Sequence, residues 1–133
     1  MSFLLTDLMI STLIIDMRFS HIGIPTKKVF PDSIFVESTM VHISDFQKCP
    51  YQIEWLRFEN DSPIKGPVRD QMHFAYTVKS IELAALNMEE LIKPWFPLPN
   101  LRAGFYLNED GLVFEFMEHH PEYILNIESS QKL

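Results

Sequence analysis

The sequence predicts an α+β fold of a single domain in which short strands carry most of the structure. Several runs of residues alternate between two kinds of side chain with a period of two, which is typical of half-buried strands. One stretch, residues 79–88, instead has the apolar spacing of a short amphipathic helix. Four strand runs bear, in chain order, His, Glu, His and Glu, and this order indicates two copies of one small unit.

Length, charge and cysteine content limit the classes of protein to which this chain can belong. The chain has 133 residues, enough for one core, and a formal net charge of −7. Nucleic-acid-binding proteins concentrate Lys and Arg, so this charge argues against DNA or RNA as a partner. The single cysteine, Cys49, cannot form an intramolecular disulfide and favours a reducing, cytoplasmic location. We therefore expect a cytoplasmic protein whose partner is a small molecule.

Residues 1–17 are expected to form an N-terminal extension of a domain that spans residues 18–133. Residues 1–16 are apolar but contain Asp7 and Asp16 and lack a basic start, so they fit neither a secretory signal nor a membrane span. Two interpretations stay open. Either the native chain starts at Met17, or the extension covers an edge of the domain.

The first unit spans about residues 18–60. Its first strand, residues 19–25, places His21 and Gly23 on one face, and the small Gly23 leaves space beside His21. Composition predicts the rest of this unit as a loop or single helical turn at 27–35, a β-rich segment at 36–44, a turn at 47–51 and a strand at 52–58.

The second unit, about residues 71–118, follows a linker at 60–67 that holds two prolines and a glycine. His73 begins a strand whose other face is bulkier, and the helix at 79–88, with Ser80 as its N-cap, should cover that bulkier face. The remaining expected elements are a Pro-rich turn at 94–100, a strand at 101–107, a hairpin turn at 108–111, a strand at 111–118 and a frayed tail at 119–133.

Two strand carboxylates ask for an explanation. Glu54 and Glu115 each lie on a half-buried strand, where an ionised carboxylate is costly unless it is paired, hydrogen-bonded or bound to a metal. Two imidazoles and two carboxylates together suit Zn, Ni, Co, Mn or Fe(II). Such an ion polarises a substrate carbonyl and eases removal of the adjacent proton, for which Glu54 or Glu115 is the candidate base.

These residues resemble the vicinal oxygen chelate superfamily, the group of glyoxalase I, methylmalonyl-CoA epimerase, extradiol dioxygenases and bleomycin-resistance proteins. The resemblance covers about residues 18–118 and rests on four runs: HIGIP at 21–25, QIEWLRF at 52–58, HFAYTV at 73–78 and NEDGLVFEFME at 108–118. It implies paired βαβββ modules that form a curved mixed sheet, with a metal site made by His21, Glu54, His73 and Glu115. A fourth ligand, Glu54, argues against the dioxygenase branch, whose members use two His and one Glu.

The function that the resemblance implies is a metal-dependent lyase or isomerase that acts by proton transfer next to a metal-chelated carbonyl. The alternative is a metal-free protein of the bleomycin-resistance type, which binds or sequesters a small molecule in the same hollow. Only 33 positions separate His21 from Glu54, whereas 42 separate His73 from Glu115, so the first module should have a shortened or missing helix. A second subunit could close the more open first half, and we expect a homodimer.

Other polar residues are weaker candidates. Arg57 shares a strand face with apolar residues and could either extend past them or bind a substrate anion. His42 is a weaker metal ligand than His21, and Glu59, Glu109 and Glu118 are expected to be solvated. The aromatic residues expected in the core, rather than in a ligand cage, are Phe105, Tyr106, Phe114 and Phe116.

Overall fold

The computed structural model describes residues 16–98 and 100–119. The extension before Asp16 and the tail after His119 therefore lie outside the described residues. The elements, in chain order, are β1 (Arg18–Pro25), β2 (Ile34–Val36), β3 (Val41–Ile43), η1 (Phe46–Lys48), β4 (Ile53–Phe58), α2 (Pro67–Asp70), β5 (His73–Thr77), α3 (Ile81–Ala84), β6 (Glu89–Leu98), β7 (Leu101–Leu107) and β8 (Val113–His119).

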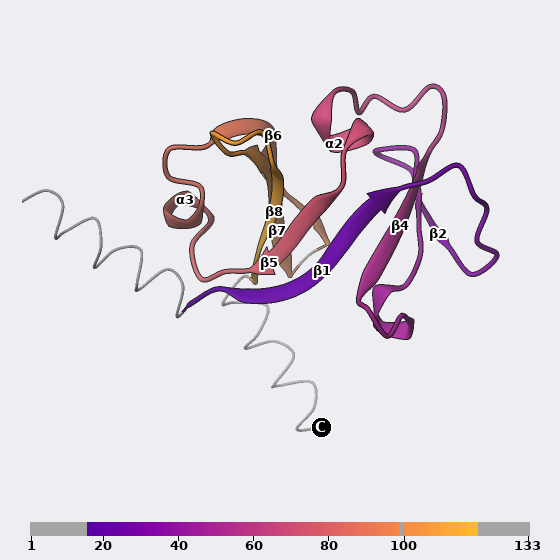
Figure 1. Ribbon diagram of the computed structural model, residues 1–133, viewed down its shortest axis with the longest axis horizontal. Helices are drawn as coiled ribbons and strands as arrows, with labels where there is room; N and C mark the ends of the chain where they lie inside the picture. The colour runs from indigo at the N-terminus through magenta and orange to yellow at the C-terminus, as the bar shows by residue number, and fades with distance from the viewer. Residues whose placement is uncertain (1–15, 99, 120–133) are drawn as a thin grey trace, which may run out of the picture.

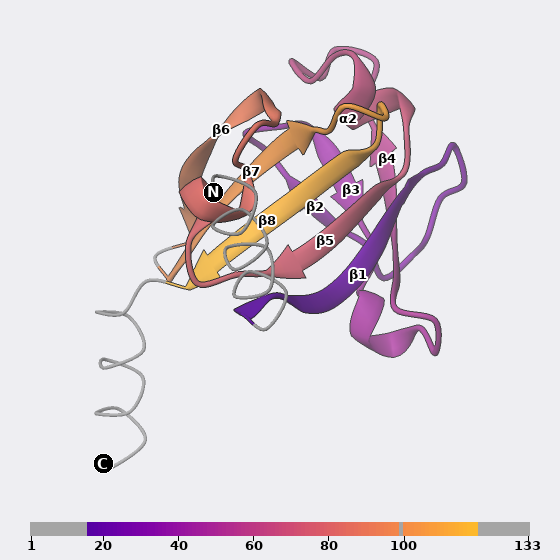
Figure 2. The same ribbon diagram turned by 60° about the vertical axis from the view of Figure 1, so that its left-hand side comes forward.

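All eight strands belong to one mixed sheet, in the order β2-β3-β4-β1-β5-β8-β7-β6. The sheet is strongly curled, and β1 and β5 run antiparallel at its centre, where they join the two halves (Figures 1 and 2). Within each half the first strand pairs in parallel with the last, β1 with β4 and β5 with β8. The predicted α+β fold with a curved mixed sheet is confirmed, and the same strand order occurs in both halves.

The single predicted helix covers the outer face of the second half. Ile81 and Ala84 of α3 pack against Tyr106 and Phe116, in a cluster that is buried from solvent. The Ser80 hydroxyl accepts a hydrogen bond from the Leu83 N–H and caps the helix as predicted. The helix is shorter than residues 79–88 because the backbone leaves the helical conformation at Ala85, with a ψ of 13°, and Asn87 then has a positive φ of 65°.

Two expected elements differ from the prediction. The β-rich segment 36–44 is not one strand, because residues 37–40 form a turn between β2 and β3 with Met40 at a φ of 50°. The Pro-rich segment 94–100 is not a turn, because β6 continues through it to Leu98. Proline cannot donate to a strand ladder, but β6 is an edge strand, and one side of its backbone needs no partner.

The connections follow the prediction more closely. Residues 26–33, between β1 and β2, contain no helix, whereas the equivalent connection of the second half contains α3. At the hairpin before β8, Gly111 has a φ of 80°, and the Asn108 side chain accepts hydrogen bonds from the N–H groups of Asp110 and Leu112. None of the helices in the described part of the chain has the length and apolar character needed to cross a membrane.

Candidate metal centre

The four predicted ligands lie on the four central strands of the sheet. His21 is on β1, Glu54 on β4, His73 on β5 and Glu115 on β8, and these strands are neighbours in the order β4-β1-β5-β8. Cross-strand register makes them neighbours, since Gly23 pairs with both Glu54 and His73. Side chains alternate along each strand, so all four point to the face opposite α3. The structure therefore brings together every residue of the predicted set.

Gly23 makes room for the ring of His73. A Cβ at position 23 would overlap the His73 imidazole. The ring is 1% exposed and lies where a side chain of β1 would otherwise stand. Glycine at this position is therefore needed for the close approach of His73 to the centre, as the small-neighbour pattern of the sequence indicated.

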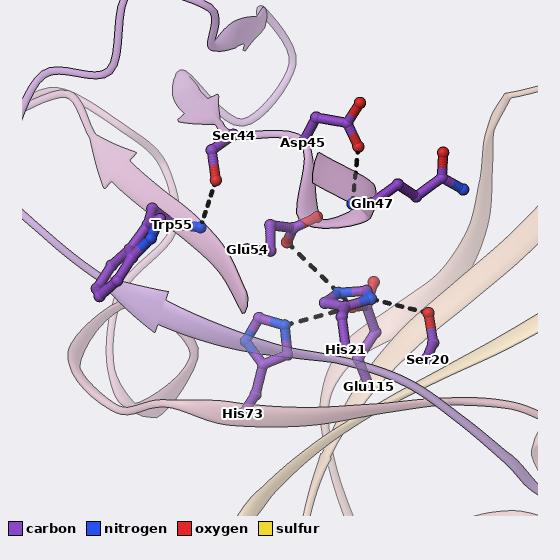
Figure 3. A network of polar contacts seen from close by, with 9 residues as sticks. All are labelled: Ser20, His21, Ser44, Asp45, Gln47, Glu54, Trp55, His73 and Glu115. Carbon is purple, nitrogen blue, oxygen red and sulfur yellow. Dashed lines mark hydrogen bonds and ion pairs between the residues drawn. The ribbon is translucent and has the colours of Figure 1, made fainter. Parts of the chain in front are cut away.

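The side chains meet around a common point (Figure 3). His21 Nε2 lies 3.5 Å from Glu54 Oε1 and 3.4 Å from Glu115 Oε1. His73 Nε2 lies 3.3 Å from the same Glu115 oxygen. His21, Glu54 and His73 each offer one ligand atom, and these three atoms lie within 4.8 Å of one another.

The donor atoms fit a divalent ion. His21 Nε2 and both ring nitrogens of His73 are buried and make no hydrogen bond to another described residue. Such groups are rarely left without a partner, because their desolvation is then uncompensated. Ligand atoms about 2.0–2.2 Å from a tetrahedral ion lie roughly 3.3–3.6 Å from one another, and the contacts of His21 and His73 fall in this range. A cation held by His21, Glu54 and His73 would satisfy the two Nε2 atoms and the Glu54 carboxylate, with the Glu115 carboxylate beside both imidazoles.

In the ion-free centre, the nearby carboxylates favour the protonated form of His21. Burial disfavours a charged imidazole at His21, but the carboxylates of Glu115 and Glu54 outweigh burial and raise the pKa of His21 to about 9. Burial alone would raise the pKa of Glu115, but His21 and His73 outweigh it and lower this pKa to about 2. The centre is thus built to attract positive charge.

Three residues that support the centre were not predicted. The Ser20 hydroxyl lies 2.9 Å from His21 Nδ1, which fixes the ring and leaves Nε2 to face the centre. The ring of Phe46 stacks on His21 with centroids 4.4 Å apart, and Phe105 meets His73 edge-on at 5.1 Å. Ser20 could have been found from its place beside His21. Phe46 reaches the site only because η1 folds back beside β4, which no local pattern reveals.

The weaker candidates lie elsewhere. His42 Nε2 lies 2.6 Å from Glu59 Oε1 on the other face of the first half, so neither residue belongs to the metal centre. The prediction that Glu118 is solvated is wrong, because its carboxylate accepts hydrogen bonds from Arg102 and from the Ile81 N–H. That carboxylate holds α3 against β7 and β8, a role decided by tertiary contacts.

Comparison with known proteins does not assign this chain to a family. The chain matches neither a model of a known protein family nor a curated protein sequence.

Proposed function

We propose that this chain is a small glyoxalase-like protein of the vicinal oxygen chelate type, and that it acts as a metal-dependent lyase or isomerase. The two sheet halves are taken as its two βαβββ modules, the first without its helix. The observation that carries the proposal is that Nε2 of His21 and Nε2 of His73 are buried, make no hydrogen bond within the described residues, and lie 3.3–3.5 Å from carboxylate oxygens.

His21, Glu54, His73 and Glu115 would hold the ion. When bound, a divalent ion supplies Lewis acidity toward a substrate carbonyl oxygen and lowers the energy of the charge that develops there. The neutral form of each imidazole is the ligand, so the proton held between His21 and the carboxylates must leave when the ion binds. Ser20 keeps Nε2 of His21 directed at the ion by occupying the other ring nitrogen.

The two carboxylates have different surroundings. Glu115 contacts both imidazoles, and its pKa is lowered to about 2, so it is a weak base as long as those contacts last. Glu54 contacts His21 alone, at 3.5 Å, among the described ion pairs. We therefore assign the transfer of the substrate proton to Glu54 and an anchoring role to Glu115.

Elemental analysis of protein purified without chelator tests the metal centre. We expect close to one divalent ion per chain, and we expect His73→Ala to lower the metal affinity by at least about a hundredfold, because a direct ligand is removed. Glu109→Gln, on an exposed turn, is the matched control and should keep the ion. If His73→Ala folds and still retains the ion, the assignment fails.

A metal-free binding protein of the bleomycin-resistance type is the second candidate. It is favoured by the rings of Phe46 and Phe105, which give the centre aromatic walls, and by the ability of the His and Glu groups to neutralise one another without an ion. In that case EDTA should leave the melting temperature unchanged. A drop of several degrees on EDTA treatment would exclude it, because a lost native-state ligand lowers stability.

The partner and the quaternary state belong to the same proposal. We propose a small-molecule substrate, a cytoplasmic location and a homodimer. The exposed side chains of Ile34 and Phe35 on edge strand β2, 69% and 44% exposed, support a contact between subunits. Light scattering should give twice the chain mass, and Ile34→Lys should return the protein to a monomer.

A further inference from the structure

A cavity of about 690 Å³ lies where β1 leaves the sheet. Pro25 and Lys27 line it on one side, Leu56, Arg57 and Phe58 of β4 on a second, and Arg69 of α2 on a third. This volume is within the range of pockets for small molecules, about 300–1,000 Å³. No ligand of the metal centre lines the cavity.

The cavity and the metal centre lie along the same face of β4. Along β4, Leu56 and Phe58 follow Glu54 on the same face, and Leu56 pairs with Pro25 of β1. A strand rises about 3.3 Å per residue, so the cavity residues of β4 lie roughly 7–13 Å beyond Glu54. This spacing is within the length of a single extended small molecule.

An unused backbone donor faces the cavity. The Leu56 carbonyl accepts a hydrogen bond from Thr26 N–H at 2.8 Å, and this is the last bond between the two chain segments. Glu59 N–H bonds to Met40 on the β3 side, so the Phe58 N–H points to the β1 side, where β1 has already ended. Within the described part of the chain, no acceptor is bonded to this N–H.

Positive charge also faces the cavity. Lys27 and Arg69 line it, and neither forms an ion pair with another described residue. Arg57 also lines it, but strand alternation turns its side chain to the opposite face, where its register partner is His42. The Arg69 guanidinium lies over the Phe58 ring, 5.7 Å from its centroid, so the cation is held against the same residue that offers the free N–H. Of the two carboxylates that also line the cavity, Glu59 is bound to His42, and Asp70 is exposed.

We propose that this cavity binds an oxyanion group, a phosphate or a carboxylate, of the molecule whose oxygen-bearing end lies at the metal centre. The Phe58 N–H and the Arg69 guanidinium are its principal donors, and charge-assisted hydrogen bonds of this kind are strong. Lys27 adds charge. The link between the two places rests on the proposed function, whereas the binding of the anion does not.

Titration of inorganic phosphate into the EDTA-treated full chain tests the cavity apart from the metal. The ¹H–¹⁵N signal of Phe58 should shift saturably at constant ionic strength. Arg69→Gln should weaken binding by at least about tenfold, since a hydrogen bond to a charged group is lost. Lys27→Gln, on an exposed loop, should weaken it less, Arg69→Lys should keep part of it, and Lys93→Gln, on the opposite edge strand β6, should leave it unchanged.

A second titration with acetate separates the two anion chemistries. Tighter binding of phosphate assigns a phosphate group to the ligand, and tighter binding of acetate assigns a carboxylate. A linear response of the Phe58 signal to both anions, or equal affinities of wild type and Arg69→Gln, overturns the proposal. Saturable binding in a chain that takes up no metal would support the cavity while defeating the proposed metal-dependent function.

Discussion

Gly23 shows how a single residue governs the candidate metal centre. It pairs with Glu54 on one side and with His73 on the other, and it leaves the space that the His73 ring fills. Its backbone φ is not in the left-handed region, so the requirement for glycine is one of space and not of conformation. A methyl group added at position 23 would therefore displace the ring of His73.

Gly23→Ala should lower the metal affinity roughly 10- to 100-fold and lower stability by about 1–3 kcal/mol, because the methyl group displaces the His73 ring. Chelator competition and urea unfolding measure the two effects. The double variant Gly23→Ala with His73→Ala is the control, since truncating the ring removes the clash. If the double variant loses as much stability as the two single variants combined, the ring is not what the methyl group strikes.

The stability of the ion-free protein should depend on pH through His21 and Glu115. The pKa of His21 is raised from 6.5 to about 9, so its stabilisation is complete below pH 6.5 and is lost as pH rises through about 9. The pKa of Glu115 is lowered from 4.5 to about 2, so its stabilisation is present above pH 4.5 and is lost as pH falls through about 2.

Urea unfolding in EDTA should therefore show a loss of stability between pH 6.5 and about 9, with an upper limit of about 3 kcal/mol for the shift of His21. His21→Gln should flatten this part of the profile, because the titrating group is absent. A wild-type profile as flat as that of the variant would contradict the ion pairing of His21 with Glu54 and Glu115.

At the scale of elements, helix α3 depends on a contact with the sheet. It has only four residues, Ile81–Ala84, too few to be stable alone. The Glu118 carboxylate accepts hydrogen bonds from the Ile81 N–H at its start and from Arg102 of β7. The Ser80 hydroxyl supplies a second cap. The helix is thus stabilised by sheet residues that lie far from it in sequence.

Glu118→Ala should destabilise the protein by about 1–2 kcal/mol, because one cap and one charge-assisted hydrogen bond are lost together. Thermal and urea unfolding measure the change. Glu109→Ala removes a carboxylate from an exposed turn and should stay within about 0.5 kcal/mol of wild type. Equal effects of the two substitutions would show that Glu118 does not anchor the helix.

At the scale of the whole molecule, the metal centre lies across the junction of the two halves. His21 and Glu54 belong to the first half, whereas His73 and Glu115 belong to the second, and the β1–β5 pair joins them. An ion bound by all four residues would therefore link the halves. The edge strands β2 and β6 bear no ligand.

Hydrogen exchange should report this link. Addition of the ion should slow amide exchange in β1, β4, β5 and β8, because their opening then requires loss of the ion. The three-residue strand β2 should exchange quickly with and without the ion, since it lies at an edge and is short. Uniform slowing across the sheet, β2 included, would place the effect of the ion elsewhere.

The amino-acid sequence by itself determined the fold class and placed each of the four candidate residues on a strand. Strand alternation decides the face on which His21 and Glu115 lie, because the period of two is a property of the backbone. The turn at Gly111 is equally local, since a positive φ and the Asn108 side chain suffice to form it. Such features need no knowledge of distant contacts.

Only the tertiary structure decided the rest. That β6 continues past Pro94 follows from its place at the edge of the sheet, and the anchoring of α3 by Glu118 follows from the pairing of β7 with β8. The contact of Phe46 with His21 and the cavity beside Phe58 depend on where β1 ends relative to β4. These features arise from contacts between segments that are distant in the chain, so local residue patterns do not predict them.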